Sequence, residues 1–193
     1  TVLHILAALH LPIPRSSSPD IQADSQPAVP SPPQKFRTAA SEEITQESTL
    51  TAILRLYSPE DDLLTLVFAS AKHAGGGFLS GSQEQEESLA RTSGLYSCQL
   101  KGERYYVIHR NTKTPFYTDN MIYSPQVPVF KTGDGKYLDD VVFSSFIASP
   151  AVNNGVISRQ EPDNLEQVGS VMKERMKKML ALALKNGHKT LLL

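Results

Sequence analysis

Cysteine is nearly absent from this chain of 193 residues, and neither charge sign dominates. The single cysteine, Cys98, excludes an internal disulfide and a four-thiolate zinc site, and we interpret it as a packing residue. A lone thiol is typical of a reducing compartment, so we expect an intracellular location, in the cytoplasm or the nucleus. The formal net charge of −1 excludes a broad basic field, so we expect no general nucleic-acid binding.

Long hydrophobic runs are also missing. No apolar run approaches the roughly 20 residues that span a bilayer, so we expect no membrane insertion. Residues 2–11 are apolar but short, and no basic segment precedes them. We therefore interpret residues 1–11 as an amphipathic helix rather than a signal peptide. Because the chain starts at Thr1 without a methionine, we interpret it as a fragment of a longer protein.

Proline and serine are concentrated in one stretch, residues 12–43. Proline removes backbone donors and serine competes with the backbone for hydrogen bonds, so this stretch favours neither helix nor central strand. We interpret it as a disordered linker or insertion. The ordered domain is expected over residues 44–193, a length that can bury a real core in one unit.

Helical and strand patterns alternate along residues 44–193. Helical spacing of apolar residues predicts helices over residues 48–56, 83–93 and 165–185. Short apolar or β-branched runs predict strands over residues 63–69, 104–109, 121–123, 127–131, 141–148 and 190–193, and residues 133–135 and 153–155 are expected to be turns or loops. Such alternation indicates an α/β fold, with helices on both faces of a mixed sheet.

The run Gly75-Gly76-Gly77 follows the apolar strand 63–69 and precedes a helix. Glycine lets the backbone approach a ligand closely, and ligands of α/β sheets lie beyond the carboxyl ends of strands. A flexible turn would explain the same glycines. The spacing matches neither the dinucleotide-binding fingerprint nor the P-loop.

Gln85, Glu86 and Glu87 come just after this loop. Their plainest interpretation is a capping box between Ser82 and Gln85, with acids at the positive end of a helix dipole. Their other interpretation is acid–base chemistry. Neighbouring helical residues diverge by roughly 100°, so Glu86 and Glu87 cannot flank one glycosidic bond as paired carboxylates. One of them should carry the proton while the other binds hydroxyls.

Further polar and aromatic residues are weaker candidates. His73 and His109 could act as acid–base groups, but no His or Cys pair has metal-ligand spacing, so we expect no metal. Phe78 could stack on a base or ribose, or close the glycine loop onto the core. Asn153 could bind ligand hydroxyls, although its Asn-Asn-Gly setting is typical of a turn.

The glycine run, a short spacer over residues 78–84 and Gln85-Glu86-Glu87 resemble the signature of poly(ADP-ribose) glycohydrolases. Further segments are similar to the microbial-type branch of that family: residues 68–72, 86–91, 117–119, 121–125, 127–130, 149–153 and 186–188. The resemblance implies a macrodomain-like three-layer α/β/α fold with a mixed sheet. It also implies a monomer that binds ADP-ribose or poly(ADP-ribose), with no cofactor.

The resemblance assigns roles to individual residues. Glu87 matches the catalytic glutamate that protonates the leaving ribose hydroxyl and then activates water. Glu86 matches the acid that orients the ribose, and Gln85 supports both. Gly75, Gly76 and Gly77 match the loop against the distal ribose and diphosphate, where Phe78 and Asn153 are further substrate-binding candidates.

The chain departs from the family pattern at two places. His73-Ala74 stand where the family usually has Asn-Pro, and the chain ends at Leu193, before the family's second glycine-containing loop. We therefore expect a C-terminally truncated macrodomain with an incomplete phosphate site. The expected function is cleavage of ribose–ribose O-glycosidic bonds to release ADP-ribose. A non-catalytic ADP-ribose binder, an inactive truncated fragment, or a hydrolase of ADP-ribose attached to protein or nucleic acid are the alternatives.

Overall fold

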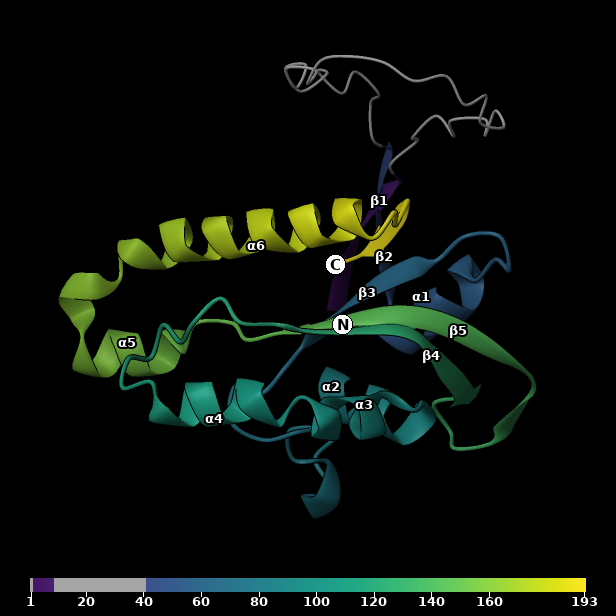
Figure 1. The fold of residues 1–193 in the computed structure, drawn as a ribbon, viewed down its shortest axis with the longest axis horizontal. Coiled ribbons are helices and arrows are strands. Elements are labelled where there is room, and N and C mark those ends of the chain that lie inside the picture. The colour runs from purple at the N-terminus through teal and green to yellow at the C-terminus, as the bar shows by residue number, and fades with distance from the viewer. Residues whose placement is uncertain (1, 9–40) are drawn as a thin grey trace, which may run out of the picture.

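A computed structural model describes residues 2–8 and 41–193 of the chain. In this part of the chain the strands form one six-stranded mixed sheet in the order β2-β1-β6-β3-β5-β4 (Figure 1). The strands are β1 Val2–Ala8, β2 Ser41–Glu47, β3 Leu63–Phe68, β4 Ile122–Lys131, β5 Tyr137–Ser149 and β6 Thr190–Leu192. β3 pairs in parallel with β5 and β6, whereas the β4–β5, β1–β6 and β1–β2 pairs are antiparallel.

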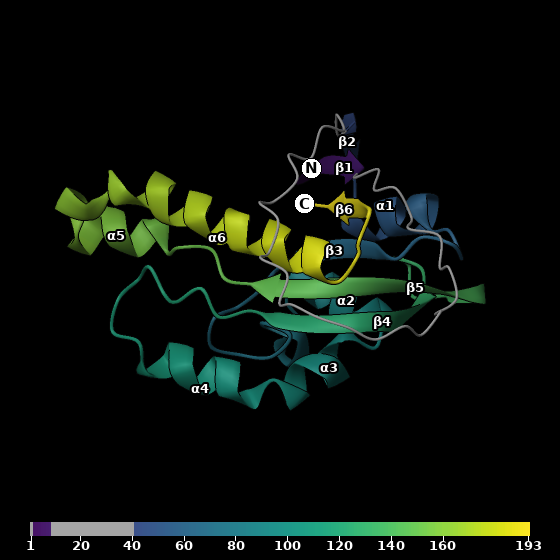
Figure 2. The same ribbon diagram turned by 45° about the horizontal axis from the view of Figure 1, so that its top comes forward.

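Helices cover both faces of this sheet. They are α1 Thr49–Leu56, α2 Gln85–Thr92, α3 Leu95–Lys101, α4 Glu103–Asn111, α5 Asn154–Gln160 and α6 Gln167–Lys185, with short 3-10 turns η1 Phe78–Ser80 and η2 Pro162–Asn164. Figures 1 and 2 show α6 along one side of the sheet and α2, α3 and α4 along the other. The α/β fold with a mixed sheet is therefore confirmed, in a three-layer arrangement.

The side chains of β3 alternate between two apolar cores. Leu63 and Val67 pack with residues of α1, α2 and α3, including Leu89. Leu64 and Leu66 point the other way and pack with α6. Successive residues of a strand face opposite sides, so a strand with apolar residues at both alternations is buried on both faces. This is the pattern that the sequence predicted for residues 63–69.

The parallel pairing of β3 and β5 decides where a ligand can approach. Their register joins Leu64 to Ser145 and Phe68 to Ser149, so both strands end at the same edge of the sheet. The loop with the three glycines leaves β3 at that edge. The antiparallel β4–β5 hairpin turns at Gly135, whose φ of 86° is in the left-handed region, as the turn prediction for residues 133–135 requires.

Three predictions of local structure are wrong. Residues 104–109 form α4 rather than a strand, because Tyr105, Tyr106 and His109 share one buried helical face. Aromatic residues favour strands only as a tendency, and burial of this face outweighs it. Residues 153–155 begin α5, with Asn153 as its N-cap, instead of forming a free loop.

The third wrong prediction concerns the amphipathic helix over residues 1–11. Val2–Ala8 form the strand β1, which pairs with β2 and β6. An apolar run of this length suits either structure, and sheet pairing decides between them. Residues 1 and 9–11 lie outside the described residues. Most of the predicted linker, residues 12–40, also lies outside them, while residues 41–43 belong to β2.

Candidate active site

A cavity of about 650 Å³ opens where β3 ends. One wall is the segment from the end of β3 through the glycine loop, and the other is the start of α2. The lining residues are Phe68, Ala69, Ser70, His73, Gly76, Gly77, Ser80, Glu84, Glu86 and Glu87. The predicted glycine loop and the two predicted carboxylates therefore meet in one cavity.

Glu87 reaches the glycine loop from the first turn of α2. It is only 6% exposed, and its Oε1 accepts a hydrogen bond of 2.7 Å from the backbone N–H of Gly77. Its Oε2 is buried and has no hydrogen-bond partner among the described residues. Buried carboxylate oxygens are rarely left without a partner, so this oxygen is available to a ligand or to an attacking water.

Glu86 is held more firmly than Glu87. Its Oε2 accepts from the backbone N–H of Ser70 at 2.7 Å, and its Oε1 accepts from Nε2 of Gln99 at 2.7 Å. Burial raises the pKa of Glu86 to about 7, and the charge of Glu87 adds to the rise, while the hydrogen bonds from Ser70 and Gln99 act against it. Glu86 is thus held at both oxygens, and its carboxyl group is partly protonated near neutral pH.

The two carboxylates converge on Gly76, although their side chains leave the helix in different directions. A Cβ at Gly76 would lie 2.3 Å from Oε1 of Glu87 and 2.9 Å from Oε2 of Glu86. Gly76 also has a φ of 58°, a conformation that residues with a side chain rarely adopt. Glycine is therefore required here for both reasons.

Gln85 holds the start of α2 against the end of β3. Its Oε1 accepts from the backbone N–H of Phe68 at 2.8 Å, and its Nε2 donates to the carbonyl of Leu66 at 2.9 Å. The predicted capping box with Ser82 is wrong, because α2 begins at Gln85 itself after Glu84 and has no side-chain cap. Gln85 does not line the cavity but positions the two glutamates beside it.

Phe78 and Asn153 lie away from the lining of this cavity. The ring of Phe78 packs on that of Tyr96, with centroids 5.0 Å apart, so it closes the glycine loop onto α3. The side chain of Asn153 accepts from the backbone N–H of Val156 at the start of α5. His109 is fully buried, where its ring nitrogens contact the carbonyl of Tyr105 and the hydroxyl of Thr118. His73, by contrast, lines the cavity.

Two residues of the site escaped the sequence prediction. Gln99 in α3 is fully buried and holds Glu86 with its Nε2, while its Oε1 accepts from the backbone N–H of Gly75 at 3.1 Å. Ser70 holds the loop from its other end, since its Oγ accepts from the backbone N–H groups of Lys72 and His73 at 3.2 Å each. Gln99 lies in a segment for which the sequence pattern predicted no helix, and a glutamine in the sequence does not indicate its partner.

The described part of the chain contains neither a metal-binding cluster nor a helix that could cross a membrane. Among residues 2–8 and 41–193, no group of three His, Cys, Asp or Glu side chains is placed to hold a metal ion. Within the same residues no helix combines the length and the apolar character needed to cross a bilayer.

Comparison with known proteins shows the family of this chain. Residues 15–132 match the family described as "Microbial-type PARG, catalytic domain", where PARG is poly(ADP-ribose) glycohydrolase. This match includes the glycine loop, both glutamates and Gln99, and it also includes most of the predicted linker. No curated protein matches the chain.

Solved structures of bacterial enzymes match over most of the described fold. Poly(ADP-ribose) glycohydrolase from Thermomonospora curvata, bound to the inhibitor ADP-HPD, is 42% identical with a TM-score of 0.70, over 75% of this chain and 54% of that one. A variant of the Deinococcus radiodurans enzyme in complex with ADP-ribose is 40% identical with a TM-score of 0.69, over 74% of this chain and 57% of that one. The chain thus spans a little over half the length of these enzymes. With the family match over residues 15–132 and the glycine-and-glutamate site described above, this chain belongs to the microbial-type poly(ADP-ribose) glycohydrolase family.

Proposed function

We propose that this chain cleaves the ribose–ribose O-glycosidic bond of poly(ADP-ribose) and releases ADP-ribose, with Glu87 as general acid and base. The observation that supports it best is the state of the Glu87 carboxyl group. One oxygen is fixed by the N–H of Gly77 and the other is buried without a partner among the described residues, beside the cavity. A general acid must be held in place and keep one oxygen free for the reacting atom.

The proposed reaction is a hydrolysis in which Glu87 first gives up a proton and then regains one from water. Glu87 gives its proton to the leaving ribose oxygen as the bond to the anomeric carbon breaks. The resulting carboxylate then takes a proton from water, whose oxygen joins the anomeric carbon, and Glu87 is protonated again. Glu86 binds the hydroxyls of the same ribose from its fixed position. Proton transfer of this kind contributes about 10²–10⁴-fold to a rate.

The remaining residues of the site would bind and position. Gly76 and Gly77 bring the backbone against the distal ribose and diphosphate, and Gln85, Gln99 and Ser70 keep the loop and α2 in register. No metal or cofactor takes part in this proposal. His73 lines the cavity where the family usually has an asparagine, and we propose that its ring makes the polar contact to the ligand there.

The test measures ADP-ribose release from purified poly(ADP-ribose) by the wild-type chain and by Glu87→Gln. Glu87→Gln keeps the shape of the side chain and removes its proton, so release should fall by at least about 100-fold while ADP-ribose binding remains. The matched control is Glu174→Gln, whose carboxylate lies exposed on α6 in a pair with Lys177. Equal release by Glu87→Gln and the wild type would refute the assignment of Glu87.

The same assay separates the alternatives. ADP-ribose binding without release by the wild type would indicate a binding module. Release from mono-ADP-ribosylated protein or nucleic acid, without release from the polymer, would indicate a hydrolase of single ADP-ribose groups.

A further inference from the structure

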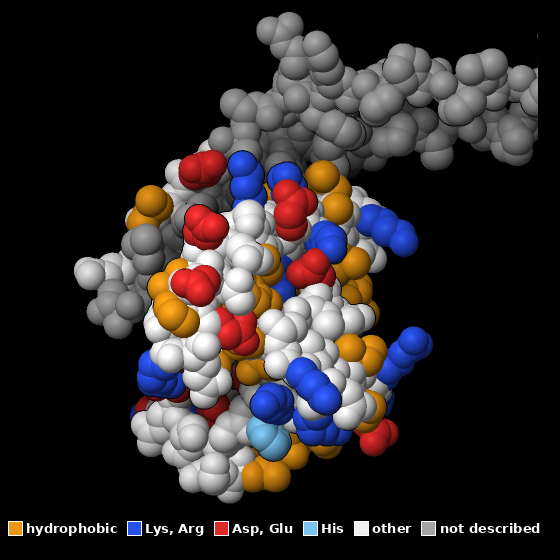
Figure 3. Space-filling model, turned by 90° about the vertical axis from the view of Figure 1, so that its left-hand side faces the viewer, with side chains coloured by type: hydrophobic (Ala, Val, Ile, Leu, Met, Phe, Trp, Pro, Cys, Tyr) orange, Lys and Arg blue, Asp and Glu red, His pale blue; other side chains and the backbone are white. Residues whose placement is uncertain are grey.

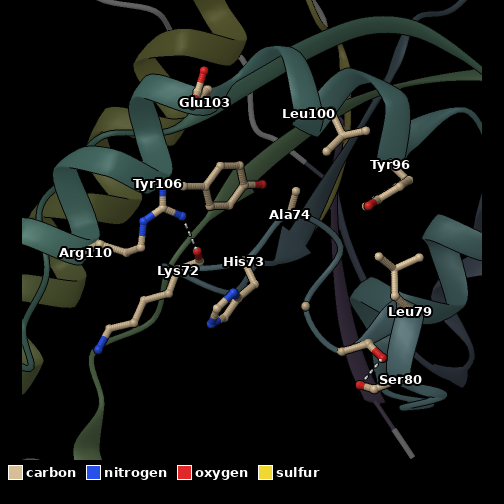
Figure 4. A pocket seen from close by; sticks show the side chains of 12 residues that line it. Lys72, His73, Ala74, Leu79, Ser80, Tyr96, Leu100, Glu103, Tyr106 and Arg110 are labelled. Atoms are coloured by element: carbon tan, nitrogen blue, oxygen red, sulfur yellow. Dashed lines mark hydrogen bonds between the residues drawn. The ribbon is translucent and has the colours of Figure 1, made fainter.

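A second cavity, of about 550 Å³, lies on the other side of the glycine loop, between that loop and helices α3 and α4 (Figure 4). It shares His73, Gly76, Gly77 and Ser80 with the cavity of the two glutamates. The two cavities are therefore neighbours with the glycine loop as a shared wall, so that one extended ligand would be able to contact both.

The lining of the second cavity is divided into two chemical halves. Figure 4 shows Lys72, His73 and Arg110 on one side and Leu79, Tyr96 and Leu100 on the other. The guanidinium of Arg110 donates to the backbone carbonyl of Lys72 at 2.9 Å, which fixes Arg110 beside this segment. Leu79 and Leu100 are 81% and 53% exposed, so their apolar side chains are accessible to a ligand. Glu103 lines the cavity as well, so two full cations, Lys72 and Arg110, stand against one carboxylate. This excess of positive charge beside an aromatic and apolar side suits a phosphate joined to a base.

Tyr106 provides a donor between the two halves. Its side chain is 3% exposed and its hydroxyl has no hydrogen-bond partner among the described residues. Figure 4 shows this hydroxyl directed from α4 toward Ala74, across the space between the cationic and apolar sides. Burial raises the pKa of Tyr106, and the nearby charge of Glu86 adds to the rise, so the hydroxyl keeps its proton and can donate it. Buried hydroxyls normally find a partner, and a ligand oxygen would supply one here.

We propose that this second cavity binds the neighbouring ADP-ribose unit of the polymer, on the leaving side of the scissile bond. This inference rests on the proposed glycohydrolase function. The adenine of that unit would lie against Tyr96 and Leu100, and its diphosphate beside Lys72 and Arg110. Tyr106 would donate to a ribose or phosphate oxygen.

The distribution of charge on the surface favours local binding of an anionic ligand over general binding of nucleic acid. In the face drawn in Figure 3, acidic and basic side chains are interspersed in the upper part, and basic side chains gather around a histidine in the lower part. With a formal net charge of −1, attraction for a polyanion has to come from such local groups.

The test compares the binding of the ADP-ribose dimer and of ADP-ribose itself to the Glu87→Gln chain, which should bind without cleaving. The dimer should bind about tenfold more tightly, which corresponds to about 1.4 kcal/mol. Adding Leu100→Glu should reduce dimer binding to the level of the monomer and leave monomer binding unchanged. Lys72→Ala, which keeps the backbone carbonyl that Arg110 uses, should weaken dimer binding by about threefold.

Ser97→Glu is the matched control, because Ser97 is exposed on the same helix and lines neither cavity. It adds the same charge as Leu100→Glu and should leave the tenfold difference intact. Equal binding of dimer and monomer, or equal losses in Leu100→Glu and Ser97→Glu, would overturn the second-cavity inference while leaving the proposed function standing. No binding of the monomer would overturn both.

Discussion

At the scale of single residues, the site depends on backbone atoms that approach carboxylates more closely than a side chain would permit. The N–H of Gly77 fixes Glu87, and the N–H of Ser70 fixes Glu86. These donors belong to the loop itself, so a change in loop conformation moves both carboxylates. Gly76 lies between them with a positive φ.

We predict that Gly76→Ala abolishes catalysis and destabilises the fold. The new Cβ would lie 2.3 Å from Oε1 of Glu87, and the φ of 58° disfavours any side chain. Gly81→Ala is the matched control, because Gly81 has a φ of 85° but a Cβ at this position would meet no other atom within 4 Å. Both changes should cost about 1–2 kcal/mol in backbone strain, measured by denaturant unfolding, but only Gly76→Ala should lose ADP-ribose release. Equal activity of the two variants would contradict the close approach of Gly76 to the carboxylate of Glu87.

We also predict that the stability of the chain depends on pH through Glu86. Its pKa is raised from 4.5 to about 7, so between these values the folded chain holds a proton that the unfolded chain has released. Stability should therefore fall as pH rises from about 4.5 to 7, by up to roughly 3 kcal/mol, since one pKa unit corresponds to about 1.4 kcal/mol. Urea unfolding at several pH values measures this fall in stability. Glu86→Gln should remove this fall, and an unchanged pH profile in that variant would disprove it.

At the scale of whole elements, the long helix α6 is fixed to the sheet by one buried cation. The side chain of Arg175 is 1% exposed and forms an ion pair with Asp119 at 3.0 Å. It also donates to the carbonyls of Pro150 at 2.6 Å and Phe116 at 2.9 Å. Arg175 thereby joins α6 to the end of β5 and to the segment that precedes β4. The sequence pattern predicted a helix over residues 165–185 but not the burial of this arginine.

We predict that Arg175→Met lowers the free energy of unfolding by about 3 kcal/mol, because it leaves two carbonyls without their donors. Lys177→Met on the same helix is the control. Lys177 is 58% exposed and pairs with Glu174 in the turn before it, so its loss should change stability by less than about 0.5 kcal/mol. Chemical denaturation of the two variants side by side measures the difference. Similar losses of stability would show that Arg175 does not fix α6 to the sheet.

At the scale of the whole molecule, the sheet order places β3 between β6 and β5. The strand that leads into the glycine loop is therefore paired on both edges, which gives the site a rigid base. The chain spans a little over half the length of the related enzymes, and both carboxylates, the glycine loop and Gln99 lie within this half.

We predict that ADP-ribose stabilises the whole chain. At a concentration 100-fold above its Kd, a ligand that binds only the folded state adds about 2.7 kcal/mol to the free energy of unfolding. Thermal unfolding with and without ADP-ribose measures this as a rise in Tm. Glucose 6-phosphate, which has a phosphate but no base, is the control and should leave Tm unchanged. No shift with ADP-ribose would argue that this half of the family's domain does not bind it.

Much of this organisation could be predicted from the sequence, because it depends on neighbours along the chain. A continuous apolar run predicted β3, and helical patterns predicted α1 and α6. The glycine run with Glu86 and Glu87 indicated a ligand site and the family. The partners of those residues could not be predicted. Gln99 reaches Glu86 and Arg175 reaches Asp119 across the fold, and α4 is a helix because one aromatic face is buried. The local sequence pattern indicates which secondary structure each segment favours. Burial and hydrogen-bond partners, by contrast, are decided only when distant segments pack together.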